Sequence, residues 1–258
     1  MTSAKSLAVH HPHTFYLDFL GCRLNAAEIE DLSRRIDGTG GKIVADPTLA
    51  DVIVLNTCAV TAQASQRSLH RIAKLHTLQP NAEIAVLGCW ATEDVNLAGK
   101  LPGVKWVLPN REKSQAVEII TGKSAKPTPW VPGKWGHTRA FLAVQDGCDH
   151  HCTYCLTRIL RGPSHSRPVN EVIGVTLNRV LNGAQEVVLT GVSLGAYGDD
   201  LGIKDGLSTL VQRLLHDTPI PRLRLSSIEP WDVTANLMRQ WENPRLCRQL
   251  HLPLRPPG

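Results

Sequence analysis

The sequence contains no apolar run that approaches the ~18 residues of a membrane-spanning helix. Its longest candidates, residues 52–55 and 84–87, have the length of strands. Residues 1–13 lack the long apolar core of a secretory signal peptide. Glycine (20) and proline (17) are too few for a collagen-like or low-complexity chain. These absences exclude the membrane, secreted and fibrous classes, and we expect a cytoplasmic protein.

The sequence also lacks a large excess of one charge. It contains 28 Lys+Arg and 23 Asp+Glu, which gives a net charge of +5. That balance permits a nucleic-acid partner without establishing one. Hydrophobic residues make up 42% of the 258 residues, so the chain can bury a core, and its length suits two domains. Seven cysteines are present. In a cytoplasmic chain they are more often metal ligands or reactive thiols than disulfides.

The first part of the chain alternates strand-like runs with helical stretches. The strands are expected at residues 14–20, 51–56, 83–88 and 104–108, and the helices at 25–36, 62–77, 93–99 and 113–120. The run at 51–56 is almost continuously apolar, which is typical of a parallel strand buried on both faces. The pattern predicts an α/β domain at residues 1–122, a small doubly wound parallel sheet.

A linker and a second α/β domain are expected to follow. Residues 123–137 are rich in proline and show no periodicity, which is typical of a linker. In residues 138–258 the expected strands are 138–144, 186–190, 222–228 and 249–254, and the expected helices are 170–181, 207–216 and 234–241. Successive β-α units of this length predict a (β/α) barrel or part of one, with its site on the loops after the strands.

Three cysteines of the second domain lie in one loop. Cys148, Cys152 and Cys155 form the pattern C-x3-C-x2-C within GCDHHCTYC. A zinc site normally has four ligands, and no fourth cysteine is near, although His150 and His151 leave a zinc alternative open. Three cysteines in a loop suit an iron–sulfur cluster, since one iron then remains open to another ligand.

This loop resembles the cluster loop of the radical S-adenosylmethionine (SAM) superfamily, C-x3-C-x-aromatic-C, with Tyr154 at the aromatic position. The resemblance implies a [4Fe–4S] cluster on Cys148, Cys152 and Cys155. Its open iron would be chelated by the amino and carboxylate groups of SAM, and one electron would cleave SAM to a 5′-deoxyadenosyl radical. The protein would bind and orient the cofactor and exclude water. The second domain would then be an incomplete radical-SAM (β/α) barrel.

The other cysteine set is Cys22, Cys58 and Cys89, and each of these residues follows an N-terminal strand. Parallel strands place their carboxyl ends along one edge of a sheet, so we expect the three side chains to meet there. A single cysteine in such a position is usually a buried structural residue. Three at the same topological position favour a shared site.

The arrangement resembles the methylthiotransferases, radical SAM enzymes that add a methylthio group to tRNA or to a ribosomal protein. The matching motifs are Gly21-Cys22 with Asn25 and Glu28, NTCAVT at 56–61, and Gly88-Cys89. The resemblance extends over residues 14–254. It implies an auxiliary [4Fe–4S] cluster on Cys22, Cys58 and Cys89 that takes part in supplying sulfur, and therefore two clusters in the chain.

Two motifs narrow the choice among the possible substrates. NTCAVT and SSIEP, at residues 226–230, favour the subgroup that acts on N6-threonylcarbamoyladenosine at position 37 of tRNA. The resemblance implies transfer of the methylthio group to C2 of that base. Isopentenyl-adenosine in tRNA, or an aspartate of a ribosomal protein, is the alternative substrate. The expected partners of a monomeric enzyme are the tRNA anticodon loop and an electron-donor protein.

Five residues are candidate contacts of SAM, and no catalytic residue is assigned. Gly191 would let the backbone approach the cofactor closely. Glu229 would accept hydrogen bonds from SAM, or it is a capping or salt-bridging carboxylate. Arg161 would bind a carboxylate or phosphate in bidentate fashion, or it is a solvated surface charge. Ser193 and Tyr154 complete the set.

The end of the sequence departs from the family pattern. Family members continue after the segment at 251–254 with further barrel strands and a small β-barrel that grips RNA, whereas this sequence stops at Gly258. We therefore expect a C-terminally truncated barrel whose fourth strand is open at its edge. Two other classes remain as alternatives: a non-catalytic fragment that keeps its cluster ligands, and a zinc-binding interaction module.

Overall fold

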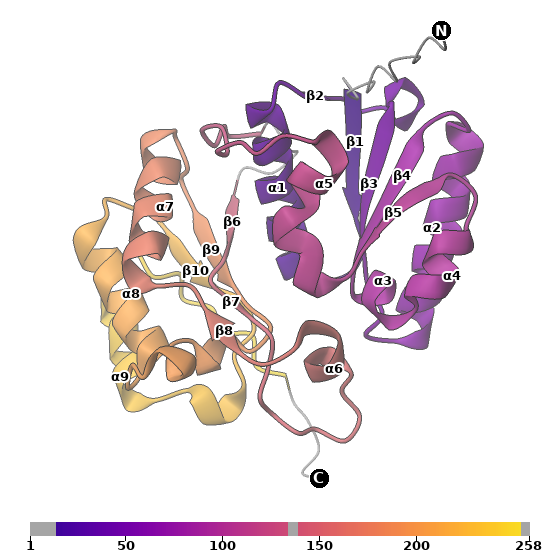
Figure 1. Cartoon of the computed structure of the whole chain (residues 1–258). Coiled ribbons are helices and arrows are strands. Elements are labelled where there is room, and N and C mark those ends of the chain that lie inside the picture. Colours follow the sequence, from indigo (N-terminus) through magenta and orange to yellow (C-terminus); the bar gives the residue numbers. More distant parts are fainter. Residues whose placement is uncertain (1–13, 134–138, 254–258) are drawn as a thin grey trace, which may run out of the picture.

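A computed structural model describes residues 14–133 and 139–253 (Figure 1). The N-terminal domain contains a five-stranded sheet in the order β2-β1-β3-β4-β5, with every neighbouring pair parallel. Its strands are β1 (Thr14–Phe19), β2 (Lys42–Ile43), β3 (Val52–Thr57), β4 (Glu83–Gly88) and β5 (Val104–Leu108). In sheets of this order, the strand order reverses between β1 and β3, and ligands bind outside the carboxyl ends there.

Helices cover both faces of this sheet. One face carries α1 (Arg23–Gly38) and α5 (Ala116–Thr121), and the other carries α2 (Ala62–Leu78), α3 (Cys89–Glu93) and α4 (Val95–Lys100) (Figure 1). Alternate residues of β3 face opposite helices: Val52 and Val54 join the core with Ile36 of α1, whereas Ile53 and Leu55 join the core with Ile72 of α2. The predicted doubly wound domain is confirmed.

The structure refines two expected helices of this domain. The helix expected at 93–99 is divided, because Asp94 leaves helical geometry and its side chain caps α4 by accepting from the Leu97 N–H at 2.9 Å. The helix before this break, α3, begins at Cys89. The helix expected at 113–120 is α5 preceded by the 3-10 segment η2 (Asn110–Gln115), and a further 3-10 turn, η1 (Pro47–Leu49), precedes β3.

The second domain is built on a three-stranded parallel sheet in the order β10-β9-β6. Its strands are β6 (Ala140–Ala143), β9 (Val187–Thr190) and β10 (Leu223–Leu225), and its main helices are α7 (Val169–Leu181), α8 (Gly206–Asp217) and α9 (Ala235–Arg239). A short antiparallel pair, β7 (Gln145–Asp146) and β8 (His165–Ser166), brackets the cysteine loop and α6 (Thr157–Arg161). The 3-10 turns are η3 (Leu194–Ala196), η4 (Asp199–Leu201), η5 (Pro230–Asp232) and η6 (Gln240–Glu242). The parallel β-α order confirms part of a barrel.

The fourth barrel strand, expected at 249–254, is not a strand within the described residues. Residues 246–251 touch β10 and the residues after it at two isolated parallel bridges, Leu223 with Leu246 and Ser227 with His251. Between them the Gln249 N–H donates to the Cys247 carbonyl at 2.7 Å, so a tight turn interrupts the ladder. The prediction of a continuous strand there is wrong for this reason. Residue 254 lies outside the described range.

The predicted linker packs against both domains up to residue 133, where its description ends. Thr128 exchanges hydrogen bonds with Arg34 of α1: its N–H donates to the Arg34 carbonyl at 3.0 Å, and its carbonyl accepts from the Arg34 side chain at 2.7 Å. Trp130 is 1% exposed and belongs to the core of the second domain. The division at residues 122 and 137 stays a prediction. No helix within the described ranges is long and apolar enough to cross a membrane.

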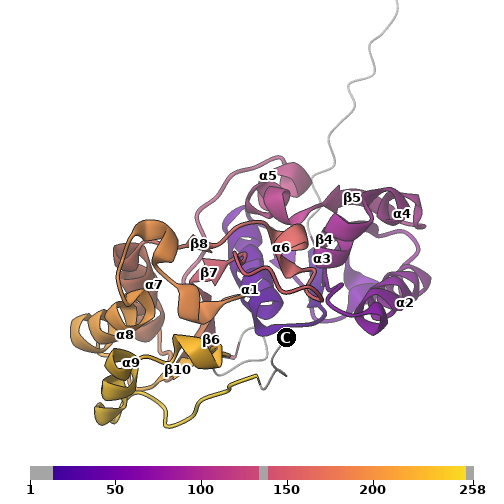
Figure 2. The same ribbon diagram turned by 90° about the horizontal axis from the view of Figure 1, so that it is seen from below.

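Helix α1 lies between the two domains and contacts β6 (Figure 1). Its Glu30 forms an ion pair of 3.2 Å with Arg179 of α7, and each side chain is only 3% exposed. On another side of the same interface, α6 contacts α3 and η2, and α6 and α3 lie together in Figure 2. The helix that follows the barrel cysteine loop thus packs against the helix that begins with Cys89.

Candidate cofactor site

The barrel cysteine loop leaves the sheet directly after β7. The β7–β8 pair closes its base, with Asp146 opposite His165. The backbone N–H of Cys148 donates to the Gly162 carbonyl at 3.1 Å, and that of Cys155 donates to the Cys152 carbonyl at 3.1 Å. These contacts fold the loop back on itself. The three thiols therefore line one pocket, as the C-x3-C-x2-C spacing predicts.

The same pocket contains two of the five candidate SAM contacts. Ser193 comes from the loop after β9 and Glu229 from the segment after β10, and both line the pocket with the three cysteines. Burial raises the pKa of the Cys148 thiol, and the neighbouring thiols of Cys155 and Cys152 raise it further. Binding a metal centre would displace these protons, since thiolates are the ligands. The roles of Ser193 and Glu229 stay predictions.

Gly191 has a different neighbour from the one expected. A Cβ at Gly191 would lie 2.8 Å from Oε1 of Gln145, so the close approach is to this buried side chain. Gln145 Oε1 accepts the Ser193 N–H at 2.9 Å, and its Nε2 donates to the Gly147 carbonyl at 2.8 Å. Gln145 therefore ties the loop after β9 to the start of the cysteine loop. No local pattern in the sequence marks Gln145, so its role becomes visible only in the structure.

The remaining two candidate contacts lie outside the pocket. Tyr154 is 68% exposed and does not line it. The Arg161 side chain is 2% exposed, which overturns the surface-charge alternative, but it points toward the N-terminal domain. Its guanidinium lies 3.0 Å from Glu28 and 2.7 Å from Asp146. Burial by itself would lower the pKa of Arg161, but the two carboxylates hold it well above its usual value.

The N-terminal cysteines lie at three neighbouring strand ends. Cys22 precedes α1, Cys58 follows β3, and Cys89 begins α3 after β4. Gly21 has φ of +94°, and a Cβ there would lie 2.6 Å from the Cys58 Cβ and 2.7 Å from its Sγ. Burial raises the pKa of the Cys58 thiol, and the thiols of Cys22 and Cys89 add to the rise. The structure thus brings the set together, while its role as a ligand set stays a prediction.

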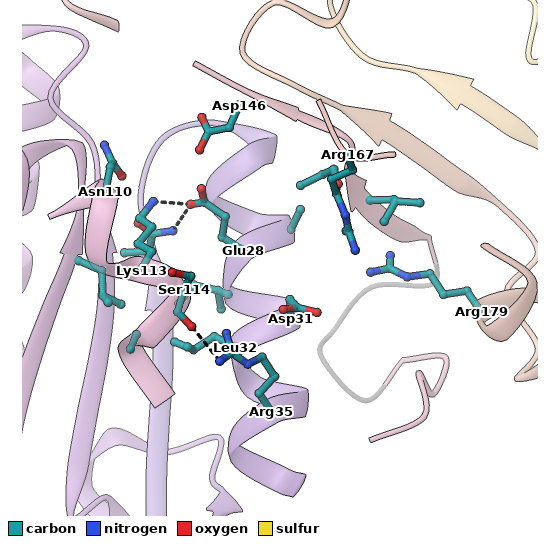
Figure 3. Close-up of a pocket in the computed structure, with 17 residues that line it drawn as sticks. Glu28, Asp31, Leu32, Arg35, Asn110, Lys113, Ser114, Asp146, Arg167 and Arg179 are labelled. Carbon is teal, nitrogen blue, oxygen red and sulfur yellow. Dashed lines mark hydrogen bonds and ion pairs between the residues drawn. The ribbon is translucent and has the colours of Figure 1, made fainter. Parts of the chain in front are cut away.

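Two polar residues of the N-terminal motif hold these strand ends. The Asn25 amide donates to the carbonyls of Leu20 at 2.7 Å and Thr57 at 3.0 Å, linking the ends of β1 and β3. Glu28 accepts from Asn56 at 2.7 Å and from Lys113 at 2.5 Å. Figure 3 shows Lys113 and Glu28 pointing toward each other. These side chains belong to the local scaffold of the cysteine set.

Glu28 stays ionised although it is mostly buried. Burial would raise the pKa of its carboxyl, but the cations of Lys113 and Arg161 lower it to about 2. The three charged groups come from α1, η2 and α6, so the pairing spans both domains. The negative charge of Glu28 compensates the cations of Lys113 and Arg161, which would otherwise be costly to remove from water.

Both cysteine sets fit the implied iron–sulfur groups. All six thiols are free, and each set would supply three sulfur ligands to a [4Fe–4S] cluster. Within residues 14–133 and 139–253, no group of three or more His, Cys, Asp or Glu side chains is arranged to hold a single metal ion. His151, one of the two histidines of the zinc alternative, bonds Arg158 at 2.8 Å through Nδ1.

Comparisons with known proteins agree with this chemistry. Residues 14–108 match the model of "Uncharacterized protein family UPF0004". The chain is 35% identical over 244 residues to threonylcarbamoyladenosine tRNA methylthiotransferase MtaB of Chlamydia pneumoniae, covering 93% of this chain and 57% of that protein. It is 30% identical over 259 residues to tRNA-2-methylthio-N(6)-dimethylallyladenosine synthase of Wolbachia pipientis wMel, covering 93% of this chain and 59% of the relative. The chain therefore spans somewhat over half the length of these relatives.

Solved structures share the fold. One of them is the radical S-adenosylmethionine methyltransferase TsrM of Kitasatospora setae, with a TM-score of 0.62 and 13% identity, covering 93% of this chain and 59% of that one. The predicted α/β architecture and the resemblance to methylthiotransferases are confirmed. Relatives named for two different adenosine substrates are both similar to this chain, so the substrate is a separate question.

Proposed function

We propose that this chain, a homologue of the tRNA methylthiotransferases, binds two [4Fe–4S] clusters and SAM and transfers a methylthio group to C2 of N6-threonylcarbamoyladenosine at position 37 of tRNA. The observation that carries the proposal is the gathering of two three-cysteine sets in domains that pack against each other. One set lies at strand ends of the N-terminal parallel sheet, and the other lies in the loop between β7 and β8. Among the described residues, neither set has a fourth side chain arranged to complete a closed structural zinc site, although His150 also lines the barrel pocket. Each leaves one iron of a cluster open for chemistry.

In the proposed enzyme, Cys148, Cys152 and Cys155 hold the cluster that binds SAM. The bound cluster and SAM supply the one-electron radical chemistry. Ser193 and Glu229 line the same pocket and offer a hydroxyl and a carboxylate to the polar groups of SAM. Gln145 holds the backbone of Ser193 in place. The chain's own task is thus to orient the cofactor beside the thiols.

Cys22, Cys58 and Cys89 hold the second proposed cluster, which takes part in sulfur supply. Exposed basic and aromatic side chains beside the barrel cysteine loop, Arg158 and Tyr154, suit a single-stranded RNA loop. Arginine attracts phosphates, and an exposed aromatic ring stacks on an unpaired base. The proposed partners are a tRNA anticodon loop and an electron-donor protein, and the proposed state is a cytoplasmic monomer.

The choice of substrate follows from the motifs and the comparisons together. The relatives named for threonylcarbamoyladenosine are 33–35% identical to this chain, against 30% for a relative named for dimethylallyladenosine. The NTCAVT and SSIEP segments favour the same subgroup. Methylthiolation of dimethylallyladenosine is the second candidate, since the resemblance covers 93% of the chain in both cases.

Anaerobic reconstitution of the chain with iron and sulfide tests the cluster proposal. About eight irons per chain are expected for two four-iron clusters. One zinc and no iron would overturn it and support the interaction-module alternative. The loaded protein is then incubated with SAM, reductant and tRNA. Mass spectrometry of the digested nucleosides should show the methylthio form of threonylcarbamoyladenosine. Release of 5′-deoxyadenosine without modified tRNA would support a truncated, damaged enzyme that cleaves SAM but does not modify RNA.

A further inference from the structure

Asn110 connects the two cysteine sets through one side chain. It begins η2, directly after β5 of the N-terminal domain. Its Nδ2 lies 3.6 Å from Sγ of Cys89 and 2.7 Å from the carbonyl oxygen of Leu160 in α6. Its own N–H donates to Thr92 Oγ1 at 2.9 Å, which holds the residue against α3. A cysteine of the first set and the helix after the barrel cysteine loop thus share one amide.

The orientation of this amide follows from its neighbours. A carbonyl oxygen only accepts, so the Asn110 NH2 group must face Leu160, and its second N–H is then available to the Cys89 sulfur. The Asn110 Oδ1 is buried and has no hydrogen-bond partner among the described residues. A buried amide oxygen without a partner is unfavourable. This side chain is therefore not accounted for by stability alone.

Arg161 forms a second connection between the same elements. It is the last residue of α6, and its guanidinium donates to the Asn25 Oδ1 at 2.7 Å, next to Cys22. The same Asn25 Oδ1 lies 3.7 Å from the Cys22 Sγ. Asn110 therefore places an N–H donor beside Cys89, and Arg161 places a buried cation one side chain away from Cys22. Both residues are attached to α6 of the other domain.

A donor and a cation near a cluster sulfur stabilise the extra negative charge of the reduced cluster. Hydrogen bonds to the sulfurs and local charge are among the factors that set the reduction potential of iron–sulfur clusters. We propose that Asn110 is a positioning residue whose N–H···S bond raises the reduction potential of the cluster on Cys22, Cys58 and Cys89. Through Leu160 it couples that potential to the docking of the barrel cysteine loop. The proposal rests on the proposed function, because it needs the N-terminal cluster.

The test isolates the N-terminal cluster in the full chain. A background variant, Cys148→Ala with Cys152→Ala and Cys155→Ala, removes the barrel set. After reconstitution, the N-terminal cluster is titrated with dithionite and followed by electron paramagnetic resonance. In this background Asn110→Leu removes the N–H donor, and Asn110→Asp keeps the side-chain volume while it removes the donor and adds negative charge.

Both variants should shift the midpoint to a more negative potential, and Asn110→Asp should shift it further. The expected size for Asn110→Leu is a tenfold change in the ratio of reduced to oxidised cluster, which is about 59 mV for one electron. An exchangeable proton coupled to the reduced cluster should disappear from the hyperfine spectrum of both variants. An unchanged midpoint and proton coupling in Asn110→Asp would overturn the proposal, even if Asn110→Leu fails to fold.

Two controls distinguish a direct effect of Asn110 on the reduction potential from an indirect effect of loosened packing between the domains. Arg34→Gln weakens the contact of α1 with Thr128, away from the cysteines, and should leave the midpoint unchanged. Asn81→Leu makes the same chemical change at an exposed turn and should also have no effect. An equal shift of the midpoint potential in Arg34→Gln would contradict the proposal that Asn110 acts through its hydrogen bond to the Cys89 sulfur. A background protein that binds no iron would instead refute the cluster proposal itself, so the two failures are distinguishable.

Discussion

Arg161 of the barrel domain places its Nη1 3.0 Å from Oε1 of Glu28 in the N-terminal domain, and the Arg161 side chain is only 2% exposed. Asp146, beside the barrel cysteine loop, shares the same nitrogen at 2.7 Å. The pair joins the helix that follows the barrel cysteines to the helix that follows Cys22. The relative placement of the two cysteine sets therefore depends on a buried charge pair.

Replacing Glu28 should destabilise the protein strongly. Glu28→Gln leaves Arg161 and Lys113 without their shared carboxylate, and breaking a buried ion pair in this way costs about 3–5 kcal/mol. The measurement is the free energy of unfolding of the metal-free chain in urea. Glu118→Gln, on the exposed side of α5, is the matched control and should change it by less than ~0.5 kcal/mol. Equal stability of the two variants would contradict the central role of Glu28.

The same carboxylate predicts a pH dependence. The folded-state pKa of Glu28 is lowered from 4.5 to about 2, so its ionisation contributes stability that is fully present above pH 4.5 and is lost as pH falls toward 2. The full contribution is about 3 kcal/mol at neutral pH. The difference in unfolding free energy between wild type and Glu28→Gln should shrink progressively below pH 4.5. A difference that stays constant down to pH 2.5 would show that Glu28 does not titrate as described.

Gly21 should be required for iron binding by the N-terminal set. In Gly21→Ala the new Cβ would clash with Cys58, and the φ of +94° adds strain. About four irons per chain are expected after reconstitution, against about eight for the unchanged chain. Gly40→Ala is a close control, because Gly40 has φ of +88° but nothing within 4 Å of its added Cβ. That variant should lose about 1 kcal/mol of stability and keep its iron.

The two cysteine sets should load independently. The first triple variant replaces Cys22, Cys58 and Cys89 with alanine, and the second replaces Cys148, Cys152 and Cys155 with alanine. Each variant should bind about four irons per chain. Cleavage of SAM should survive only in the first variant. Cys247→Ser serves as the control, since Cys247 lies outside both sets and should bear on neither readout. Loss of all iron in either triple variant would indicate one shared centre.

Glu229 should contribute to SAM affinity. It lines the pocket with the barrel cysteines, so Glu229→Gln removes a charge-assisted acceptor beside the cofactor. The expected effect is roughly a tenfold rise in the Kd of SAM for the iron-loaded chain, measured by calorimetry. Glu242→Gln, at an exposed position after α9, should leave the Kd unchanged. Equal affinities would assign Glu229 to a structural role.

Local sequence determined most of the elements and both cysteine sets. The apolar run of β3 predicts a strand buried on both faces, and Cys22, Cys58 and Cys89 each follow a strand, so parallel topology brings them to one edge. The spacing of the barrel cysteines likewise keeps them in one loop. These features depend on periodicity and on neighbours within a few residues, which a single sequence displays directly.

Only the tertiary structure decided which polar side chains serve the sites. Gln145 bonds Ser193 across 48 positions, and Asn110 bonds Leu160 across 50. Arg161 was expected to bind cofactor or to be solvated, and it pairs with Glu28 of the other domain. Most buried polar groups are hydrogen-bonded, and where the partner is distant along the chain no local pattern in the sequence records it.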